Sequence, residues 1–98
     1  HLKSMSYSKL HMVFGMVEDK EAGEILKLLP KDAQYYFCKA DVPRALDSNI
    51  LANKAEACGL SGKSIPSVKE ALKMARANAA DNDLIFVGGS AFVVAEVL

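Results

Sequence analysis

The stretch that most resembles a chemical motif is Gly59–Ser64, which contains the pattern G-x-x-G-K-S. This is the second half of the phosphate-binding loop G-x-x-x-x-G-K-[ST], whose backbone N–H groups and lysine hold nucleotide phosphates. The first glycine of the full pattern is replaced by Ala57. A phosphate loop also leaves a strand and opens a helix, whereas this stretch follows a helical pattern and precedes Pro66. We therefore predict an ordinary helix-to-strand connection, in which Gly62 helps to turn the chain.

A second glycine-rich stretch, Gly88-Gly89-Ser90, stands in a better context for ligand binding. An apolar strand pattern precedes it and an apolar helical pattern follows it, although the complete G-x-G-x-x-G pattern is absent. Glycines at such a turn let the backbone approach a ligand, or let the helix pack closely on the sheet. Both interpretations stay open at this point.

Three charged residues follow the first two predicted strands: Asp19, Lys20 and Arg44. Asp19 and Lys20 could touch a ligand, but a helix N-cap and a solvated lysine explain them equally well. Arg44 could hold a carboxylate or a phosphate through paired hydrogen bonds. A solvated or acid-paired arginine is the alternative.

The remaining reactive side chains form no complete catalytic set. His11 lies within a predicted strand, where a structural role is expected. Cys38 and Cys58 have neither C-x-x-C spacing nor a paired histidine, so we interpret them as buried or half-buried thiols. The sequence shows no Ser-His-Asp set, no carboxylate pair and no metal-ligand cluster. We therefore predict no catalytic residue and no metal ligand within this chain.

The bulk composition describes an ordinary globular domain of 98 residues, with 51% hydrophobic and 24% charged residues. Twelve basic and twelve acidic residues balance, which gives no electrostatic argument for nucleic acid or an anionic membrane as a partner. No apolar run is long enough to span a bilayer, and the N-terminus lacks the continuous apolar stretch of a secretory signal. A cytoplasmic protein is expected. His1 is either native or the remnant of a tag.

Four strands are predicted to alternate with four helices. The strands are expected at residues 9–17, 34–38, 63–65 and 84–87. The helices are expected to begin at the N-caps Asp19, Asp47 or Ser48, Ser67 and Ser90, and to end at Pro30, before Gly59, near Ala79 and at Leu98. Such alternation gives an α/β fold with a Rossmann-like open, mainly parallel sheet of about four strands in the order 3-2-1-4, flanked by helices on both faces. Ligands bind such sheets where the strand order reverses, which would bring residues 15–20 beside residues 88–90.

Four stretches, taken in order, resemble the carboxyl-terminal domain of folylpolyglutamate synthases and dihydrofolate synthases, within the Mur ligase superfamily. The match covers nearly the whole chain, so residues 1–98 are interpreted as a single domain of a larger ligase. The matching stretches are His11–Gly15 with Asp19–Glu21, Pro43–Ala45, Val68–Ala75 and Leu84–Leu98. One departure concerns Gly88, which stands where the family often has threonine.

The resemblance implies a parent enzyme that uses ATP and Mg²⁺ to activate the carboxylate of a folate or dihydropteroate as an acyl phosphate, which the amine of glutamate then attacks. The phosphate loop and the metal ligands belong to the central ATPase domain of such enzymes. This domain would close over the active site, help to bind the incoming glutamate and be inactive alone. By resemblance, Gly89, Ser90 and Arg44 are expected at the substrate, and Asp19 and Lys20 at the nucleotide or the domain interface.

Two other hypotheses need no parent enzyme. The chain could be a free-standing Rossmann-like module that binds a small molecule, or an oligomerisation module whose apolar edge or helix surface forms the contact.

Overall fold

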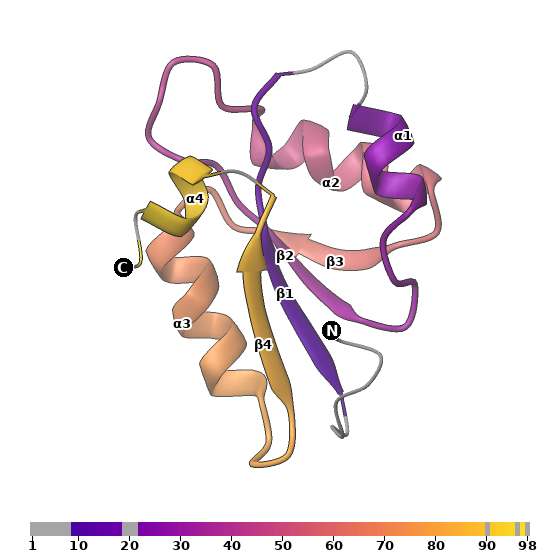
Figure 1. Cartoon of the computed structure of the whole chain (residues 1–98), viewed down its shortest axis with the longest axis vertical. Coiled ribbons are helices and arrows are strands. Elements are labelled where there is room, and N and C mark those ends of the chain that lie inside the picture. The colour runs from indigo at the N-terminus through magenta and orange to yellow at the C-terminus, as the bar shows by residue number, and fades with distance from the viewer. Residues whose placement is uncertain (1–8, 19–21, 90, 96, 98) are drawn as a thin grey trace.

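The computed structural model describes residues 9–18, 22–89, 91–95 and 97 (Figure 1). Strands and helices alternate along the chain, and all three pairs of neighbouring strands are parallel. The strand order β3-β2-β1-β4 confirms the predicted topology. In chain order the elements are β1 (Leu10–Phe14), α1 (Ala22–Lys27), β2 (Gln34–Phe37), α2 (Ser48–Ala57), β3 (Ser61–Ser64), α3 (Val68–Asn78), β4 (Leu84–Gly88) and α4 (Ala91–Ala95).

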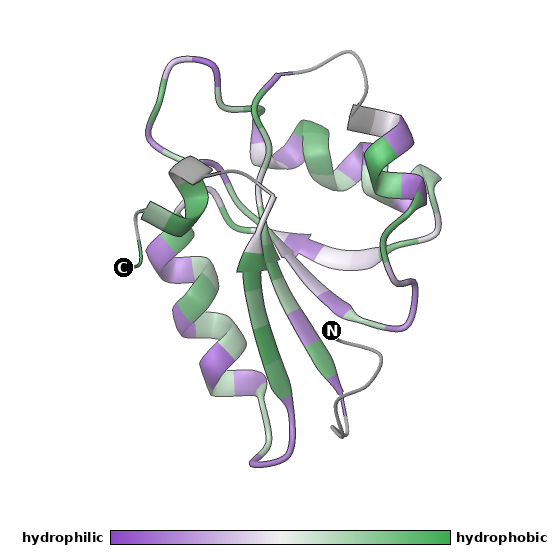
Figure 2. Cartoon of the chain, viewed as in Figure 1, coloured by the Kyte–Doolittle hydropathy of each residue, from purple (hydrophilic) through white to green (hydrophobic). Residues whose placement is uncertain are grey.

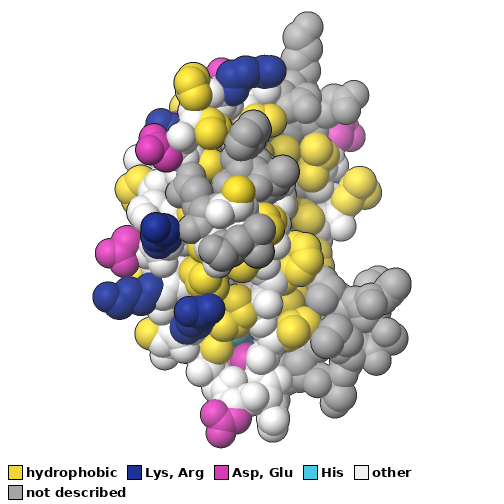
Figure 3. Space-filling model, turned by 60° about the vertical axis from the view of Figure 1, so that its left-hand side comes forward, with side chains coloured by type: hydrophobic (Ala, Val, Ile, Leu, Met, Phe, Trp, Pro, Cys, Tyr) yellow, Lys and Arg dark blue, Asp and Glu magenta, His cyan; other side chains and the backbone are white. Residues whose placement is uncertain are grey.

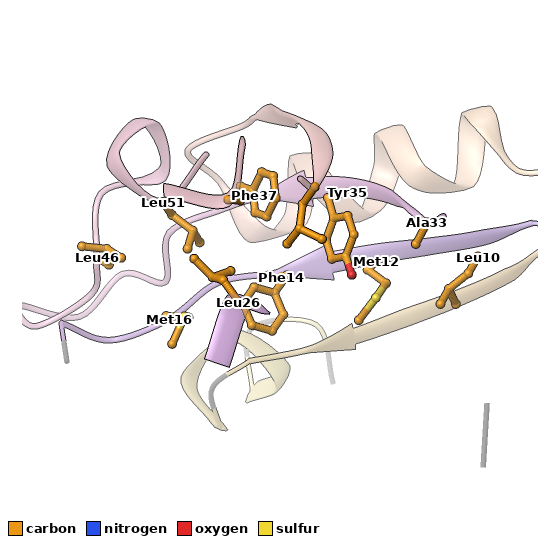
Figure 4. Close-up of a cluster of buried hydrophobic side chains, with 12 residues drawn as sticks. Leu10, Met12, Phe14, Met16, Leu26, Ala33, Tyr35, Phe37, Leu46 and Leu51 are labelled. Atoms are coloured by element: carbon orange, nitrogen blue, oxygen red, sulfur yellow. The ribbon is translucent and has the colours of Figure 1, made fainter. Parts of the chain in front are cut away.

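Helices cover both faces of the sheet, because the central strands bury side chains on either side. All five residues of β1 are buried. The side chains of Met12 and Phe14 pack with Leu26 of α1 and Leu51 of α2 in one apolar cluster (Figure 4). A second cluster lies on the opposite face, where α3 and α4 pack on the sheet. It comprises Val13, Tyr36, Cys38, Ala40, Ala45, Val68, Ala71, Ala75 and Val93.

Two predicted helix caps are present. The carboxylate of Asp47 accepts hydrogen bonds from the backbone N–H groups of Asn49 and Ile50 at the start of α2. The hydroxyl of Ser67 accepts one from the N–H of Glu70 at the start of α3. Each cap satisfies donors that have no partner inside the helix and stabilises the fold by about 1 kcal/mol.

The connection from α2 to β3 confirms the role of Gly59 and corrects that of Gly62. Gly59 has a φ of 87°, and the N–H groups of Gly59 and Leu60 donate to the carbonyls of Glu56 and Ala55. This is the Schellman ending of a helix. Gly62 does not turn the chain, because it lies inside β3 opposite Tyr35. A Cβ there would come within 2.7 Å of Tyr35 and Phe37, so glycine permits a close approach of two strands.

Several predicted boundaries were wrong by a few residues. β1 ends at Phe14, not at residue 17, because Val17 leaves the parallel ladder and forms an isolated antiparallel bridge with Ala45. β3 begins earlier than predicted, at Ser61, because its pairing with β2 sets its bounds. The apolar pattern of its own residues does not. α1 ends at Lys27, not at Pro30, and the N–H groups of Leu28 and Leu29 still donate to the carbonyls of Ile25 and Leu26. α4 is described only for residues 91–95, and its predicted N-cap Ser90 lies outside the described residues.

Tyr35 ties β2 to the connection that precedes it. Its ring is fully buried and stacks on that of Phe37 with 5.3 Å between the centroids, and its hydroxyl donates to the carbonyl of Pro30 at 2.6 Å. Burial, with a smaller effect from the charge of Asp32, raises the pKa of Tyr35 to about 12. The phenol therefore stays neutral and keeps donating well above neutral pH.

β4 forms an edge of the sheet and is apolar along its length (Figure 2). Phe86 is 39% exposed, and Leu84, Ile85 and Val87 are half-buried. Figure 3 shows hydrophobic side chains gathered over the middle of one face of the molecule, with basic and acidic side chains beside them. Among the helices in the described part of the chain, none is both long enough and apolar enough to cross a membrane.

Candidate functional site

The carboxyl ends of β1 and β4 meet where the strand order reverses, as predicted for a ligand site. Beyond β1, the N–H of Gly15 donates to the carbonyl of Gly88 at 3.3 Å. On the other side, the N–H of Cys38 donates to the carbonyl of Phe14 at 2.9 Å. The loop after β1 therefore lies between the ends of its two neighbouring strands.

Gly89 rests directly on this loop. Its φ of 96° lies in a backbone region that residues other than glycine rarely adopt. A Cβ at Gly89 would collide with the carbonyl oxygen of Gly15 and lie 2.9 Å from Cε1 of Phe14. The residue itself is exposed, so its backbone is accessible from solvent. Close packing of this glycine on the loop after β1 is therefore observed, and the approach of a ligand to its exposed backbone stays a prediction.

The loop after β2 carries Arg44 to the other side of the same β1 loop. The N–H of Glu18 donates to the carbonyl of Arg44 at 2.7 Å, and the N–H of Leu46 donates to the carbonyl of Met16 at 2.8 Å. Nη2 of Arg44 donates to the carbonyl of Glu18 at 3.3 Å. The guanidinium is exposed, and among the described residues its hydrogen bond to Glu18 leaves further N–H donors that could reach a ligand. Backbone pairing thus fixes where Arg44 emerges from the fold.

A surface pocket of about 410 Å³ adjoins this arginine. It is lined by Val17, Val42, Pro43 and Arg44. Apolar walls beside one guanidinium suit a small ligand with an aliphatic stem and a carboxylate. Sequence reasoning singled out Arg44 but missed the apolar walls. Val42 and Pro43 adjoin Arg44 in the sequence, but Val17 is brought there only by its bridge to Ala45.

The predicted site residues divide into two groups. Gly89 and Arg44 lie at the same end of the sheet, each bonded to or packed on the loop after β1. Asp19, Lys20 and Ser90 lie outside the described residues. No group of three or more His, Cys, Asp or Glu side chains gathers into a metal site within residues 9–18, 22–89, 91–95 and 97. The described residues thus place an exposed guanidinium beside an apolar pocket, and ligand binding there stays a prediction.

The stretch Gly59–Ser64, which resembles part of a phosphate-binding loop, lies away from this site. Lys63 lies in the middle of β3, the opposite edge strand, and pairs with Tyr36. Its side chain is exposed, and no helix begins directly after it, because α3 starts only at Val68. The geometry of a phosphate-binding loop is therefore absent here.

Replacing Lys63 with alanine is expected to leave both stability and function nearly unchanged. Replacing an exposed lysine on an edge strand changes the free energy of unfolding by no more than about 0.5 kcal/mol. Urea unfolding of the variant chain measures the first effect, and turnover of a full-length parent protein measures the second. Collapse of turnover with unchanged unfolding would restore a phosphate-binding role for this lysine.

Comparison with known proteins gives a consistent result. The family described as Mur ligase, glutamate ligase domain, matches residues 1–91. The chain is 40% identical over 98 residues to the probable bifunctional folylpolyglutamate synthase/dihydropteroate synthase of Haloferax volcanii. That match covers 97% of this chain and 12% of the relative, so the chain spans only about an eighth of the relative's length.

Solved structures agree on the fold. The structure of E. coli FolC in complex with DHPP and ADP superposes with a TM-score of 0.85 at 28% identity, over 98% of this chain and 22% of that one. The bifunctional folylpolyglutamate synthase/dihydrofolate synthase of Yersinia pestis, complexed with AMPPNP and Mn, gives a TM-score of 0.75 at 27% identity. It covers 91% of this chain and 21% of that one.

Proposed function

The chain belongs to the Mur ligase glutamate ligase domain family, and we propose that it serves as the carboxyl-terminal domain of an ATP-dependent folate–glutamate ligase. The parent enzyme would activate the carboxylate of a folate or dihydropteroate as an acyl phosphate. The amine of glutamate would then displace the phosphate and form an amide bond. Relatives named as folylpolyglutamate synthases, at up to 40% identity, support this assignment.

ATP and Mg²⁺ would be held by the ATPase domain of the same polypeptide. The described part of this chain offers no cluster of metal ligands, and its only Gly-Lys-Ser sequence forms an edge strand. Two structural neighbours were solved with ADP or with AMPPNP and Mn, over chains more than four times longer than the matched portion. These neighbours support ATP and a divalent metal as cofactors of the parent enzyme. The reaction would take place in the cytoplasm, where ATP is available.

The observation that carries the role of this domain is the pocket at the carboxyl end of the sheet, with Arg44 at its side. We propose that the incoming glutamate binds at this carboxyl end of the sheet. The guanidinium of Arg44 would hold one carboxylate, and Val17 and Val42 would contact the aliphatic stem. Gly89 would offer its backbone on the other side of the β1 loop, and Ser90, the next residue in the sequence, would offer its hydroxyl.

Asp19 and Lys20 are proposed to face the nucleotide or the interface with the ATPase domain. They continue the same β1 loop beyond Glu18, whose backbone is fixed by Arg44. A loop that touches both the glutamate side and the nucleotide side would let domain closure exclude water from the acyl phosphate.

The isolated chain is expected to form no glutamylated folate from ATP, glutamate and folate, because the phosphate loop and the metal ligands are assigned to the ATPase domain of the parent enzyme. Product formation by the purified 98-residue chain would contradict the proposal.

Calorimetry separates the proposed function from the two alternative functions. Binding of ATP, glutamate or folate with a Kd of about 10 μM or tighter, near −7 kcal/mol, would favour a free-standing binding module. A concentration-dependent dimer in sedimentation would favour an oligomerisation module.

A further inference from the structure

Residues 16–18, after β1, and residues 44–46, after β2, form a short antiparallel ribbon at the carboxyl end of the sheet. Val17 and Ala45 pair at its centre, and a backbone hydrogen bond crosses the ribbon on either side of them. Three of its side chains are buried in the two apolar clusters: Met16, Ala45 and Leu46. The ribbon is therefore anchored in the fold, and it fixes the two loops relative to each other.

Glu18 and Arg44 lie opposite each other at one end of this ribbon. The N–H of Glu18 donates to the carbonyl of Arg44 at 2.7 Å, and Nη2 of Arg44 donates to the carbonyl of Glu18 at 3.3 Å. Side chains at such opposed positions begin about 4.5–5.5 Å apart at their Cβ atoms. Both side chains are exposed. The ribbon thus presents a carboxylate and a guanidinium to solvent, one beside the other.

These two charged groups do not neutralise each other by direct contact. The guanidinium of Arg44 bonds the backbone of Glu18, and the ion pairs found among the described residues do not include these two side chains. Arg44 also borders the apolar pocket formed with Val17, Val42 and Pro43. A ligand that fits both charged groups carries a cation and an anion close together. An α-amino acid has this pattern, because its ammonium and its carboxylate are attached to the same carbon atom.

We propose that Glu18 binds the ammonium group of the incoming amino acid, while Arg44 holds its α-carboxylate. This assignment rests on the proposed function and adds an amine-binding residue to the same site. Hydrogen bonds between charged groups of opposite sign are stronger than neutral ones and fix the orientation of the ligand. The aliphatic stem of glutamate would then lie along Val17 and Val42. Glu18 acts here by binding and orientation, and takes no part in bond formation.

A carboxylate at position 18 would also make the site selective for an amino acid over a plain dicarboxylate. It attracts an ammonium group and repels a further anion that approaches Arg44. Glutarate has the carbon chain and both carboxylates of glutamate but lacks the amine. Glu18 is therefore expected to favour glutamate over glutarate, which gives this residue a signature that is separate from that of Arg44.

Glu18→Gln in a full-length parent protein tests the assignment. The KM for glutamate is expected to rise roughly tenfold, because a hydrogen bond between charged groups is replaced by a weaker one. The KM for ATP should change little. The inhibition constant of glutarate, used as a competitor of glutamate, should stay the same or fall, because the carboxylate that repels it is gone. Urea unfolding of the 98-residue chain should be unchanged, since the side chain is exposed.

Two further variants serve as controls. Glu18→Asp keeps the negative charge on a shorter side chain, so it should recover part of the affinity for glutamate. Glu56→Gln makes the same chemical change at an exposed acid near the end of α2, just before the amino end of β3. It should leave the KM for glutamate and the inhibition by glutarate unchanged.

The possible failures of this assignment and of the proposed function can be told apart. Glutamylation with an unchanged KM for glutamate in Glu18→Gln would overturn the assignment alone. Equal weakening of glutamate and glutarate would also overturn it, because Glu18 would then act through Arg44 or through the fold and not on the amine. Absence of glutamylation by the unaltered parent protein would refute the proposed function, and the assignment would fall with it.

Discussion

Gly89→Ala is expected to lower the free energy of unfolding of the chain by roughly 2–4 kcal/mol. Two effects add. The φ of 96° is strained for any residue with a Cβ, and the new methyl group would meet the backbone of Gly15 and the ring of Phe14. Neither neighbour can withdraw easily, since Gly15 is bonded to Gly88 and Phe14 is buried in the core. Urea unfolding followed by circular dichroism measures the loss.

Gly23→Ala is the matched control for this prediction. Gly23 lies in α1, and a Cβ there would meet nothing within 4 Å. The same chemical change should therefore stabilise the chain slightly, by up to about 1 kcal/mol, because alanine favours a helix. Equal effects of the two substitutions would show that Gly89 is not constrained as described.

Arg44→Ala in a full-length parent protein is expected to raise the KM for glutamate roughly 10- to 100-fold, since a hydrogen bond to a charged group contributes about 1.5–3 kcal/mol. The KM for ATP should change little, because the nucleotide is assigned to another domain. Stability should also change little, because the side chain is exposed and its one hydrogen bond to a described residue goes to the backbone of Glu18. Steady-state kinetics with each substrate varied in turn measures these effects.

Arg76→Ala provides the comparison at an exposed arginine of the same type, in the last turn of α3. It should leave both KM values unchanged. Arg44→Lys should recover only part of the affinity, because lysine keeps the charge but not the planar fork of donors. An unchanged KM for glutamate in Arg44→Ala would remove this residue from the substrate site.

Sequence patterns predicted the fold well where local chemistry decides it. Asp47, Ser67 and Gly59 act on backbone groups within a few residues, so their roles follow from type and position. The strand order followed from the alternation of strands and helices, because crossovers between parallel strands have one favoured hand. Gly62 shows where sequence patterns fail, because the need for glycine there comes from Tyr35 on the neighbouring strand.

The site could be predicted only in part, for the same reason. Arg44 was identifiable from its type and from its place after a strand. The bridge between Val17 and Ala45, which builds the pocket wall, joins residues far apart in the chain and has no local signal. The bond between His11 and Asp83 likewise spans 72 positions, so a histidine with a structural role was the most that the sequence could indicate.

The central claim is that this domain helps an ATP-dependent folate–glutamate ligase to bind the incoming glutamate. The most direct test is to assay a full-length parent protein for ATP-dependent glutamylation of folate, with and without the segment that corresponds to residues 1–98. Glutamylated folate and ADP should form with the segment present. Without it, glutamylation should be lost while nucleotide binding persists. Glutamylation at an undiminished rate after removal of the segment would contradict the account.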